Sequence, residues 1–414
     1  MPQTLAEHLS PATGPKRMLA LDGGGVKGTI TLGMLVHLEN ELRRRAGGNP
    51  DFRLSHYYDL IGGTSTGSII ATGLALGLSV SELMDFYLDL GPRIFGRKAG
   101  DGTLFASKFD SKGLRDALRP VLGTKTLGTD QLKTGLAIFT KRIDTGSAWV
   151  LTNHPKAKYF DTLPDSNVFP NKRYRLIDIV QASAAAPTFF DEVTIRMEYD
   201  DTNRARAGSE GYFVDGAVGG HNNPSVQMLM LALVPSYGFN WQRGARNLMM
   251  TSCGTGYRRP RIDGRKFATK VPALRGADAL RSMIHDTVKQ NIALMQALSH
   301  SQIPWTIDSE IETLDGVCIT GDPMLDFQRI DVILDTWDAK DRRQKRKTDP
   351  LPTNLEKLIG KPLTRVQFDR IDALDFGERG HLELLREIGL KTGERFISAA
   401  YPDPAFDLPE WTAA

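Results

Sequence analysis

The chain has 414 residues, of which 41% are hydrophobic and 24% are charged, a composition typical of a globular protein with a large core. Its 52 Lys and Arg residues nearly balance 49 Asp and Glu residues, which leaves a formal net charge of +3. A protein dedicated to nucleic-acid binding would carry a larger and more clustered basic excess, so we expect no nucleic-acid polymer among its partners.

Three features of the sequence predict a cytoplasmic location. Cys253 and Cys318 are the only cysteines, and two thiols cannot form a disulfide framework or a four-cysteine zinc site. The N-terminal segment 1–17 lacks the charged start and the apolar run of a signal peptide. The most apolar stretches, 69–80 and 228–234, are shorter than the ~18 residues of a membrane-spanning helix. Any membrane contact, for instance at the inner membrane face, is therefore expected to be peripheral.

Apolar runs separated by glycine-rich turns predict alternating strands and helices. In chain order, we predict strands over residues 18–21, 57–61, 136–140, 148–151, 212–214 and 247–251. We predict helices from residue 27 to about residue 45, over 68–78 and 177–186, through the apolar stripe at 280–292, and over 382–388. The order strand, glycine turn, helix occurs twice near the N-terminus, and this order is typical of an α/β fold.

The pentapeptide Gly63-Thr-Ser-Thr-Gly67 matches the G-x-S-x-G pattern of a serine nucleophile. Flanking glycines let the chain turn sharply from strand to helix, so that the Ser65 hydroxyl is exposed and the N-terminus of the next helix faces a developing oxyanion. A glycine-rich turn with a capping serine would have the same residues. The strand predicted before the motif and the apolar helix after it favour the nucleophile.

The segment Asp22-Gly-Gly-Gly-Val-Lys-Gly28 also joins a predicted strand to a predicted helix. Consecutive glycines allow several backbone N–H groups to converge on one oxygen. A phosphate-binding loop is the competing interpretation, but the Walker pattern requires Gly-Lys-Ser/Thr, whereas here Lys27 precedes Gly28. We therefore interpret this segment as an oxyanion hole. The glycines expected to form it are Gly23, Gly24 and Gly25.

The third motif, Asp215-Gly-Ala217, follows the predicted strand over 212–214. An aspartate at the end of a strand and before a glycine is often a turn residue. It can also serve as a base for a serine, provided that its surroundings raise its pKa from about 3.9. The sequence cannot show how close Asp215 lies to Ser65.

With these three motifs in this order, the chain resembles the patatin-like phospholipase family. Three further blocks support the resemblance: Ala182-Ser-Ala-Ala-Ala-Pro-Thr188, Asn222-Asn-Pro224 and Gly254-Thr-Gly256. The matching blocks span roughly residues 17–256, and the rest of the chain resembles the family only faintly. The chain departs from the family at Ser68, where many members have another glycine.

The resemblance implies a three-layer α/β/α fold with a central, mostly parallel sheet and a C-terminal helical extension. It also implies hydrolysis of acyl esters in phospholipids or lysophospholipids through an acyl-enzyme intermediate. In this scheme Ser65 is the nucleophile, Asp215 is the general base, and neither a metal nor a cofactor is required. The residues that support the motifs are Asp22, Lys27, Gly28, Gly63, Gly67, Gly216 and Ala217.

A Ser-His-Asp triad is the alternative to a dyad. In α/β-hydrolases the histidine follows the acid in the chain, and four histidines follow Asp215: His221, His285, His300 and His381. A nucleophile as early as Ser65 leaves little room for the strands that precede the serine in that fold. The position of Ser65 therefore favours the dyad.

We find no convincing interdomain linker and predict one elaborated catalytic domain over residues 17–400. Its core motifs lie within 17–256, and a mainly helical extension follows over 260–400. Residues 1–16, which are rich in Pro, Thr and Ser, are expected to form a flexible lead, and residues 401–414 a C-terminal tail.

Other functions stay open at this point. The chain could hydrolyse small soluble esters or thioesters, or bind lipids with silent catalytic machinery. The basic run over 340–347 could attract anionic headgroups, although a solvated loop is favoured, and the looser basic segment over 258–266 is also interpreted as a loop. Some bacterial members of the family are effectors in antiviral signalling that a cyclic nucleotide activates, and the extension leaves room for such control. The sequence indicates no oligomeric state.

Overall fold

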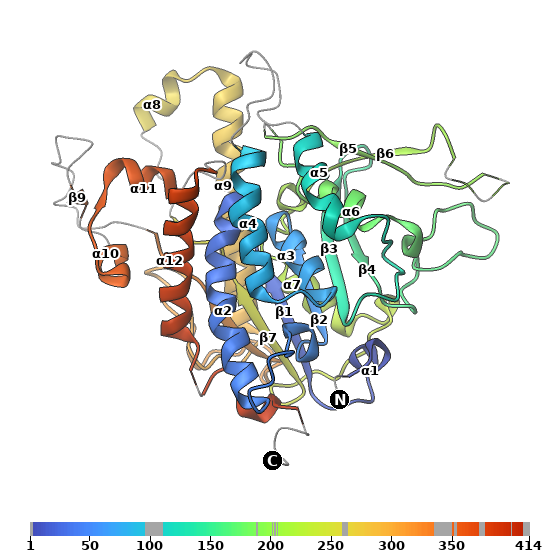
Figure 1. Cartoon of the computed structure of the whole chain (residues 1–414), viewed down its shortest axis with the longest axis horizontal. Coiled ribbons are helices and arrows are strands. Elements are labelled where there is room, and N and C mark those ends of the chain that lie inside the picture. The colour runs from blue at the N-terminus through green and yellow to red at the C-terminus, as the bar shows by residue number, and fades with distance from the viewer. Residues whose placement is uncertain are drawn as a thin grey trace.

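The computed structural model describes residues 3–95, 111–187, 189–200, 202, 204, 206–258, 264–334, 350–351, 354–371, 377–398 and 400–408. The strands of its main sheet are β1 (Lys16–Leu21), β2 (Leu60–Thr64), β3 (Gly135–Arg142), β4 (Ser147–Thr152), β5 (Val193–Arg196), β6 (Glu210–Asp215), β7 (Leu248–Cys253) and β8 (Asp326–Ile330). Among the described residues they pair in the order β5-β6-β3-β2-β1-β7-β8, with β4 also paired to β3 (Figure 1).

The centre of the sheet is parallel, as predicted. Strands β3, β2, β1, β7 and β8 run in one direction, whereas β4, β5 and β6 are antiparallel to their neighbours. Every residue of β1 and of β7 is buried. Continuous burial is expected for parallel strands, because their crossover connections place helices on both faces of the sheet.

Helices cover both faces of this sheet (Figure 1). Their bounds are α1 (Leu5–Leu9), α2 (Gly28–Arg45), α3 (Thr66–Ala75), α4 (Val80–Phe95), α5 (Ser111–Leu122), α6 (Leu176–Ser183), α7 (Ser225–Leu233), α8 (Gly264–Thr269), α9 (Pro272–Ala297), α10 (Asn354–Ile359), α11 (Arg365–Ile371) and α12 (Arg379–Phe396). Alternate residues of β1 point to opposite faces, so Leu19 and Leu21 pack with α2 to α6 and α12, whereas Met18 and Ala20 pack with α7 and α9. The predicted three-layer α/β/α architecture is confirmed.

The predicted elements omit helices α4, α5 and α7 and strand β5. Two further differences arise where burial decides the structure. The strand predicted over 57–61 is displaced, since β2 begins at Leu60 and Tyr57 and Tyr58 are buried in the turn before it. Because aromatic residues are enriched in strands, tyrosines that are buried outside a strand can look like part of one in the sequence. The strand β8, Asp-Phe-Gln-Arg-Ile, is mostly polar and was not predicted.

The extension over 260–400 is mainly helical, but it also contributes β8 to the main sheet. Helix α12 lies along α2 (Figure 1), and the two backbones approach closely at Gly33. A side-chain carbon added at Gly33 would lie 2.7 Å from the backbone nitrogen of Leu390. A small two-stranded sheet, β9 (Pro350–Leu351) with β10 (Leu363–Thr364), completes the described part of the extension. The boundaries proposed between core, extension and tail remain a prediction.

No helix in the described part of the chain combines the length and the apolar character that crossing a bilayer requires.

Residues 4–16 differ from the flexible lead expected for them, because they fold back onto the sheet. Thr4 caps α1 through the backbone N–H of Glu7, and His8 and Leu9 are buried. The Trp241 side-chain N–H donates to the Leu9 carbonyl at 3.3 Å. Helix α1 is thus tied to a residue more than 200 positions away in the sequence.

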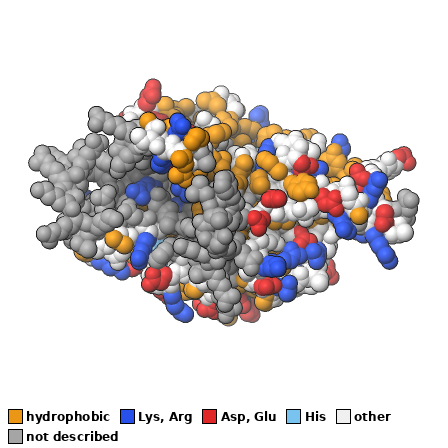
Figure 2. All heavy atoms as spheres, turned by 90° about the horizontal axis from the view of Figure 1, so that it is seen from above, with side chains coloured by type: hydrophobic (Ala, Val, Ile, Leu, Met, Phe, Trp, Pro, Cys, Tyr) orange, Lys and Arg blue, Asp and Glu red, His pale blue; other side chains and the backbone are white. Residues whose placement is uncertain are grey.

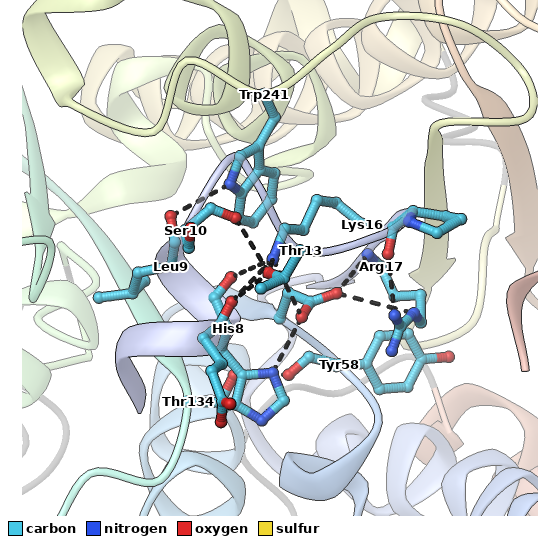
Figure 3. Close-up of polar contacts among 12 residues, drawn as sticks. His8, Leu9, Ser10, Thr13, Lys16, Arg17, Tyr58, Thr134 and Trp241 are labelled. Atoms are coloured by element: carbon cyan, nitrogen blue, oxygen red, sulfur yellow. Dashed lines mark hydrogen bonds and ion pairs between the residues drawn. The ribbon is translucent and has the colours of Figure 1, made fainter. Parts of the chain in front are cut away.

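A buried carboxylate, Asp59, anchors this segment. Its basic neighbours His8, Lys16 and Arg17 are labelled in Figure 3. One of its oxygens lies 2.9 Å from Nδ1 of His8 and 3.7 Å from Nζ of Lys16, and the other accepts the backbone N–H of Arg17 at 2.8 Å. Burial alone would raise the pKa of Asp59, but Arg17, His8 and Lys16 hold it below its usual value. Asp59 is therefore ionised at neutral pH and balances the basic groups around it.

We predict that Asp59→Asn lowers the free energy of unfolding by about 3 kcal/mol at pH 7, because it leaves buried basic groups without a counter-charge. A group whose folded pKa is lowered contributes its stability above its unfolded pKa, so the difference between variant and wild type should narrow as the pH falls below about 4. Urea titrations at several pH values measure both effects.

Asp161→Asn is the matched control, since the ion pair of Asp161 with Lys172 is exposed. It should leave the urea midpoint unchanged. Equal effects of the two substitutions would contradict the role assigned to Asp59.

Candidate active site

The three sequence motifs meet at the carboxyl ends of neighbouring strands. The glycine loop follows β1, Ser65 follows β2, and Asp215 is the last residue of β6. Strand β3 lies between the latter two, with Phe139 paired to Thr64 on one side and Thr140 paired to Asp215 on the other. This register brings Ser65 and Asp215 together although 149 residues separate them in the chain.

Ser65 occupies the sharp turn that its motif predicts. Its backbone has φ 55° and ψ −126°, in the left-handed region that residues with side chains rarely adopt. Helix α3 begins at the next residue, so its N-terminus lies directly at Ser65. Gly67 is needed at this turn, because a side-chain carbon there would lie 2.8 Å from the carbonyl oxygen of Asp22.

Two hydroxyl groups hold the turn in place. The Ser65 backbone N–H donates to Oγ of Ser183 at 2.9 Å, and that hydroxyl donates to the Phe139 carbonyl at 2.6 Å. On the other side, the Tyr87 hydroxyl lies 2.6 Å from Oγ1 of Thr66 and donates to the Thr66 carbonyl at 3.0 Å. Ser183 belongs to the block over 182–188, to which no role was assigned from the sequence, and Tyr87 carried no motif signal.

Asp215 is buried, and its carboxylate lies close to the Ser65 side chain. One carboxylate oxygen accepts the Ala217 backbone N–H at 2.9 Å. Burial raises the pKa of Asp215 to about 6, while hydrogen bonds from Ala217 and from the Ser65 side chain act in the opposite direction. The rise in pKa that a carboxylate base requires is therefore produced by desolvation. Gly216 packs tightly, since an added side-chain carbon would lie 2.9 Å from the Thr64 side chain.

The glycine loop lies against the serine, but its N–H groups are not equivalent. An added side-chain carbon at Gly23 would lie 3.1 Å from Cβ of Ser65. The backbone N–H of Gly23, however, donates to the Asn222 carbonyl at 3.0 Å. Among the described residues, no hydrogen bond engages the N–H of Gly24 or Gly25. The N–H of Gly23 therefore already has a partner, and the role of Gly23, Gly24 and Gly25 as oxyanion donors stays a prediction.

A buried ion-pair network supports the loop from behind. The guanidinium of Arg329, on β8, binds both oxygens of Asp22 at 3.0 and 2.6 Å and one oxygen of Asp331 at 2.7 Å. Asn223 donates to Asp22 at 2.8 Å. Burial alone would lower the pKa of Arg329, but the two carboxylates raise it above its usual range. Asp22 is thus a structural residue of the loop. Its partner Asn223 belongs to the Asn222-Asn-Pro224 block, whereas Arg329 comes from a segment outside the sequence motifs.

The other two motif residues of the loop also have structural contacts. The Lys27 ammonium is buried and donates to the Gly256 carbonyl at 3.3 Å, which joins the loop to the Gly254-Thr-Gly256 turn. Gly28 packs beside the turn at Ser65, since an added side-chain carbon would lie 3.1 Å from the ring of Tyr87, which holds that turn. Gly63 packs against Gly67 across the turn, where no side chain would fit.

The histidines do not complete a triad. Within the described residues, no hydrogen bond joins a histidine to Ser65 or Asp215. Burial lowers the pKa of His221, whose Nε2 has no hydrogen-bond partner in the described part of the chain. His300 pairs with Asp326 at 2.9 Å, and His285 lies on α9, its ring 6.3 Å from that of Tyr257. His381 is buried on α12.

A cavity of about 490 Å³ opens over Ser65 and Asp215. Its walls are largely apolar and come from several helices and from the loop after α6. The apolar residues that line it include Leu114, Phe190, Leu280, Ile284, Val288 and Leu382. Such a wall suits a hydrocarbon chain with its carbonyl group at the serine.

Metal ligands and the basic segments are the remaining features to place. In the described part of the chain, no group of three or more His, Cys, Asp or Glu side chains is arranged to hold a metal ion. The basic run over 340–347, most of the basic segment over 258–266 and Thr188 lie outside the described residues.

We predict that Ser183→Ala lowers the free energy of unfolding by about 2 kcal/mol, because it leaves the buried Ser65 N–H without an acceptor. Ser68→Ala is the matched control. Oγ of Ser68 donates to the Ser65 carbonyl, which also accepts the Ser68 backbone N–H at 2.9 Å and so stays satisfied. Urea unfolding of both variants measures the difference, and a Ser68→Ala variant as unstable as Ser183→Ala would contradict it.

The chain is similar to several known proteins. Patatin-T5 and Patatin group A-3 of Solanum tuberosum are each 30% identical to the chain over 252 residues, and the match covers 58% of this chain and 60% of either relative. Human GIVD cytosolic phospholipase A2 aligns with a TM-score of 0.44 at 10% identity, covering 94% of this chain and 60% of that one. VipD from Legionella pneumophila aligns with a TM-score of 0.31 at 12% identity, covering 72% and 58%. The family model described as patatin-like phospholipase matches residues 19–228, about half of the chain, and the chain therefore belongs to the patatin-like phospholipase family.

Proposed function

We propose that this protein hydrolyses acyl esters of phospholipids or lysophospholipids, with Ser65 as nucleophile and Asp215 as general base. The observation that carries the proposal is the buried Asp215 carboxylate, which lies close to the Ser65 side chain and whose pKa is raised by burial to about 6. Membership of the patatin-like phospholipase family supports a lipid ester as the substrate class. The chain spans about 60% of the length of the relatives that it matches.

In the first step, Oγ of Ser65 attacks the acyl carbonyl carbon while the Asp215 carboxylate accepts the hydroxyl proton. A pKa near 6 leaves Asp215 ionised at neutral pH and makes it a stronger base than an exposed aspartate. The tetrahedral intermediate then collapses, the bond to the lipid alcohol breaks, and Asp215 returns the proton to the leaving oxygen. The products of this step are the alcohol and an acyl-Ser65 ester.

In the second step, water attacks the acyl-enzyme while Asp215 again accepts a proton. Collapse of this second intermediate breaks the bond to Oγ of Ser65, which is reprotonated, and releases the fatty acid. Both intermediates carry a negative oxygen. We assign its stabilisation to the unengaged N–H groups of Gly24 and Gly25 and to the N-terminus of α3, which begins at Thr66.

The cavity supplies the binding energy for this chemistry. An acyl chain placed against the walls formed by Leu280, Ile284 and Val288 leaves water and positions its carbonyl group at Ser65. Substrates held in membranes would be reached from the surface, so we propose peripheral contact with a bilayer. A cytoplasmic location and the absence of any cofactor requirement are parts of the same proposal.

We predict that Ser65→Ala and Asp215→Asn each reduce fatty-acid release from phosphatidylcholine vesicles by at least about a thousandfold, because each removes a member of the unit that forms the acyl-enzyme. Mass spectrometry of the products measures the loss, and circular dichroism checks that both variants fold. His221→Gln is the control and should retain most of the activity.

The outcomes separate the alternatives. Substantial turnover by Ser65→Ala would exclude the dyad, and a collapse in His221→Gln would favour a triad. Labelling of wild-type Ser65 by a fluorophosphonate, with turnover only of short nitrophenyl esters, would indicate a soluble-ester hydrolase. Neither labelling nor turnover would indicate a lipid-binding protein with silent machinery.

We also predict a single ionisation in the acidic limb of the pH profile. Asp215 must be deprotonated to act as a base, so kcat/KM should rise as the pH increases through about 6 and fall about tenfold per unit well below it. Initial rates between pH 4.5 and about 8 on a neutral lipid ester measure the profile. A rate that does not change between pH 5 and about 7 would contradict Asp215 as the base.

A further inference from the structure

Helix α9 changes character along its length. Its C-terminal half is packed in the protein, where Val288, Ile292 and Met295 are buried. Its N-terminal half is open to solvent, with Leu274 49% and Met283 64% exposed. This helix lies outside the segment 19–228 that the family model matches. The exposed half of α9 therefore lies outside the part of the chain that the family model describes.

One face of α9 lines the cavity above Ser65. Its cavity-lining residues progress from the buried Val288 through Ile284 to Arg281, which is exposed. A helix rises 1.5 Å per residue, so Arg281 lies about 10 Å from Val288 along the helix axis. Val288 is deep in the apolar cavity, and Arg281 marks its opening. Figure 2 looks down on this end of the molecule and shows hydrophobic side chains beside Lys and Arg side chains.

The charged groups of the cavity are compensated unequally. Asp22 and Asp331 both pair with the guanidinium of Arg329, and Asp215 lies close to the Ser65 side chain. Lys27 donates to a carbonyl oxygen deep beside the glycine loop. Arg281 differs from the others, since it makes no hydrogen bond or ion pair with any described residue. The nearest acidic residue one turn before it, Asp278, is paired with Lys270.

We propose that Arg281 is a specificity-determining residue that binds the phosphate of a glycerophospholipid while its acyl chain occupies the cavity. This inference rests on the proposed function and names the part of the substrate that the opening of the cavity recognises. A guanidinium matches two oxygens of a phosphodiester with parallel N–H bonds and stays charged at every physiological pH. An uncharged diacylglycerol offers the same ester and acyl chains, but no anion to Arg281.

The kinetic test compares phosphatidylcholine with diacylglycerol that carries the same acyl chains, each dispersed at low mole fraction in neutral detergent micelles. In Arg281→Gln, the ratio of kcat/KM for phosphatidylcholine to kcat/KM for diacylglycerol should fall about tenfold, mainly through KM, since a hydrogen bond to a charged group is lost. Arg281→Lys keeps the positive charge but cannot form two parallel N–H bonds, so it should give an intermediate ratio.

Arg275→Gln is the matched control, because Arg275 is an exposed arginine of the same helix that does not line the cavity. It should keep the wild-type ratio. A wild-type ratio in Arg281→Gln would overturn the proposal. An equal fall of this ratio in Arg275→Gln would also overturn the proposal. In that case a general attraction between the basic helix surface and the phospholipid-containing micelle would explain the effect.

A binding measurement distinguishes failure of this inference from failure of the proposed function. In the Ser65→Ala background, calorimetry with dihexanoylphosphatidylcholine below its micellar concentration should give a Kd about tenfold weaker after Arg281→Gln, and unchanged after Arg275→Gln. This result would support phosphate recognition even if the wild-type protein hydrolysed neither lipid. Equal affinities with and without Arg281, or no binding by the Ser65→Ala protein, would overturn it.

Discussion

The left-handed backbone of Ser65 is the constraint on which the rest of the site depends. A residue with a side chain enters this region at a cost of about 1–3 kcal/mol, so the surrounding structure must hold it there. Ser183 accepts its N–H from α6, Tyr87 fixes the next residue from α4, and Gly67 allows the turn to touch the end of β1. Two helices and the end of β1 are therefore needed to hold one hydroxyl group in position. The strain also explains why the turn needs glycines on either side of the serine.

Two buried carboxylates, Asp22 and Asp215, line the same cavity but have different hydrogen-bond and ion-pair partners. Asp22 receives two bonds from the guanidinium of Arg329 and one from Asn223, so its charge is compensated in place. Asp215 accepts one backbone N–H and lies close to the Ser65 side chain, and no cation among the described residues pairs with it. Burial raises the pKa of both carboxylates, to about 6 at Asp215, but Arg329 and Asn223 oppose the rise at Asp22. In the proposed mechanism, this difference makes Asp215 the base and leaves Asp22 to support the loop.

Much of the fold follows from local sequence. Glycine-rich turns between apolar segments predicted the parallel α/β core, and the pattern at 136–151 predicted the hairpin of β3 and β4, which is confirmed. The displaced strand at 57–61 and the missed β8 have one cause. Burial of Tyr57 and Tyr58, and of the polar Gln328 and Arg329, depends on partners distant in the chain and leaves no periodic pattern. For the same reason α1 was expected to be flexible, because Asp59 and Trp241, which hold it, are remote in sequence.

The sequence by itself determined the candidate functional groups: a serine in a tight turn, a run of glycines and an aspartate at the end of a strand. Those features are local, because turn geometry and strand-to-helix order depend on neighbouring residues. Only the tertiary structure decided that Asp215 lies at Ser65, that Asn222 engages the N–H of Gly23, and that Arg329 neutralises Asp22. It also decided that α9 forms the wall and the opening of the cavity. Desolvation, hydrogen-bond competition and cavity shape each depend on segments that meet only when the chain has folded.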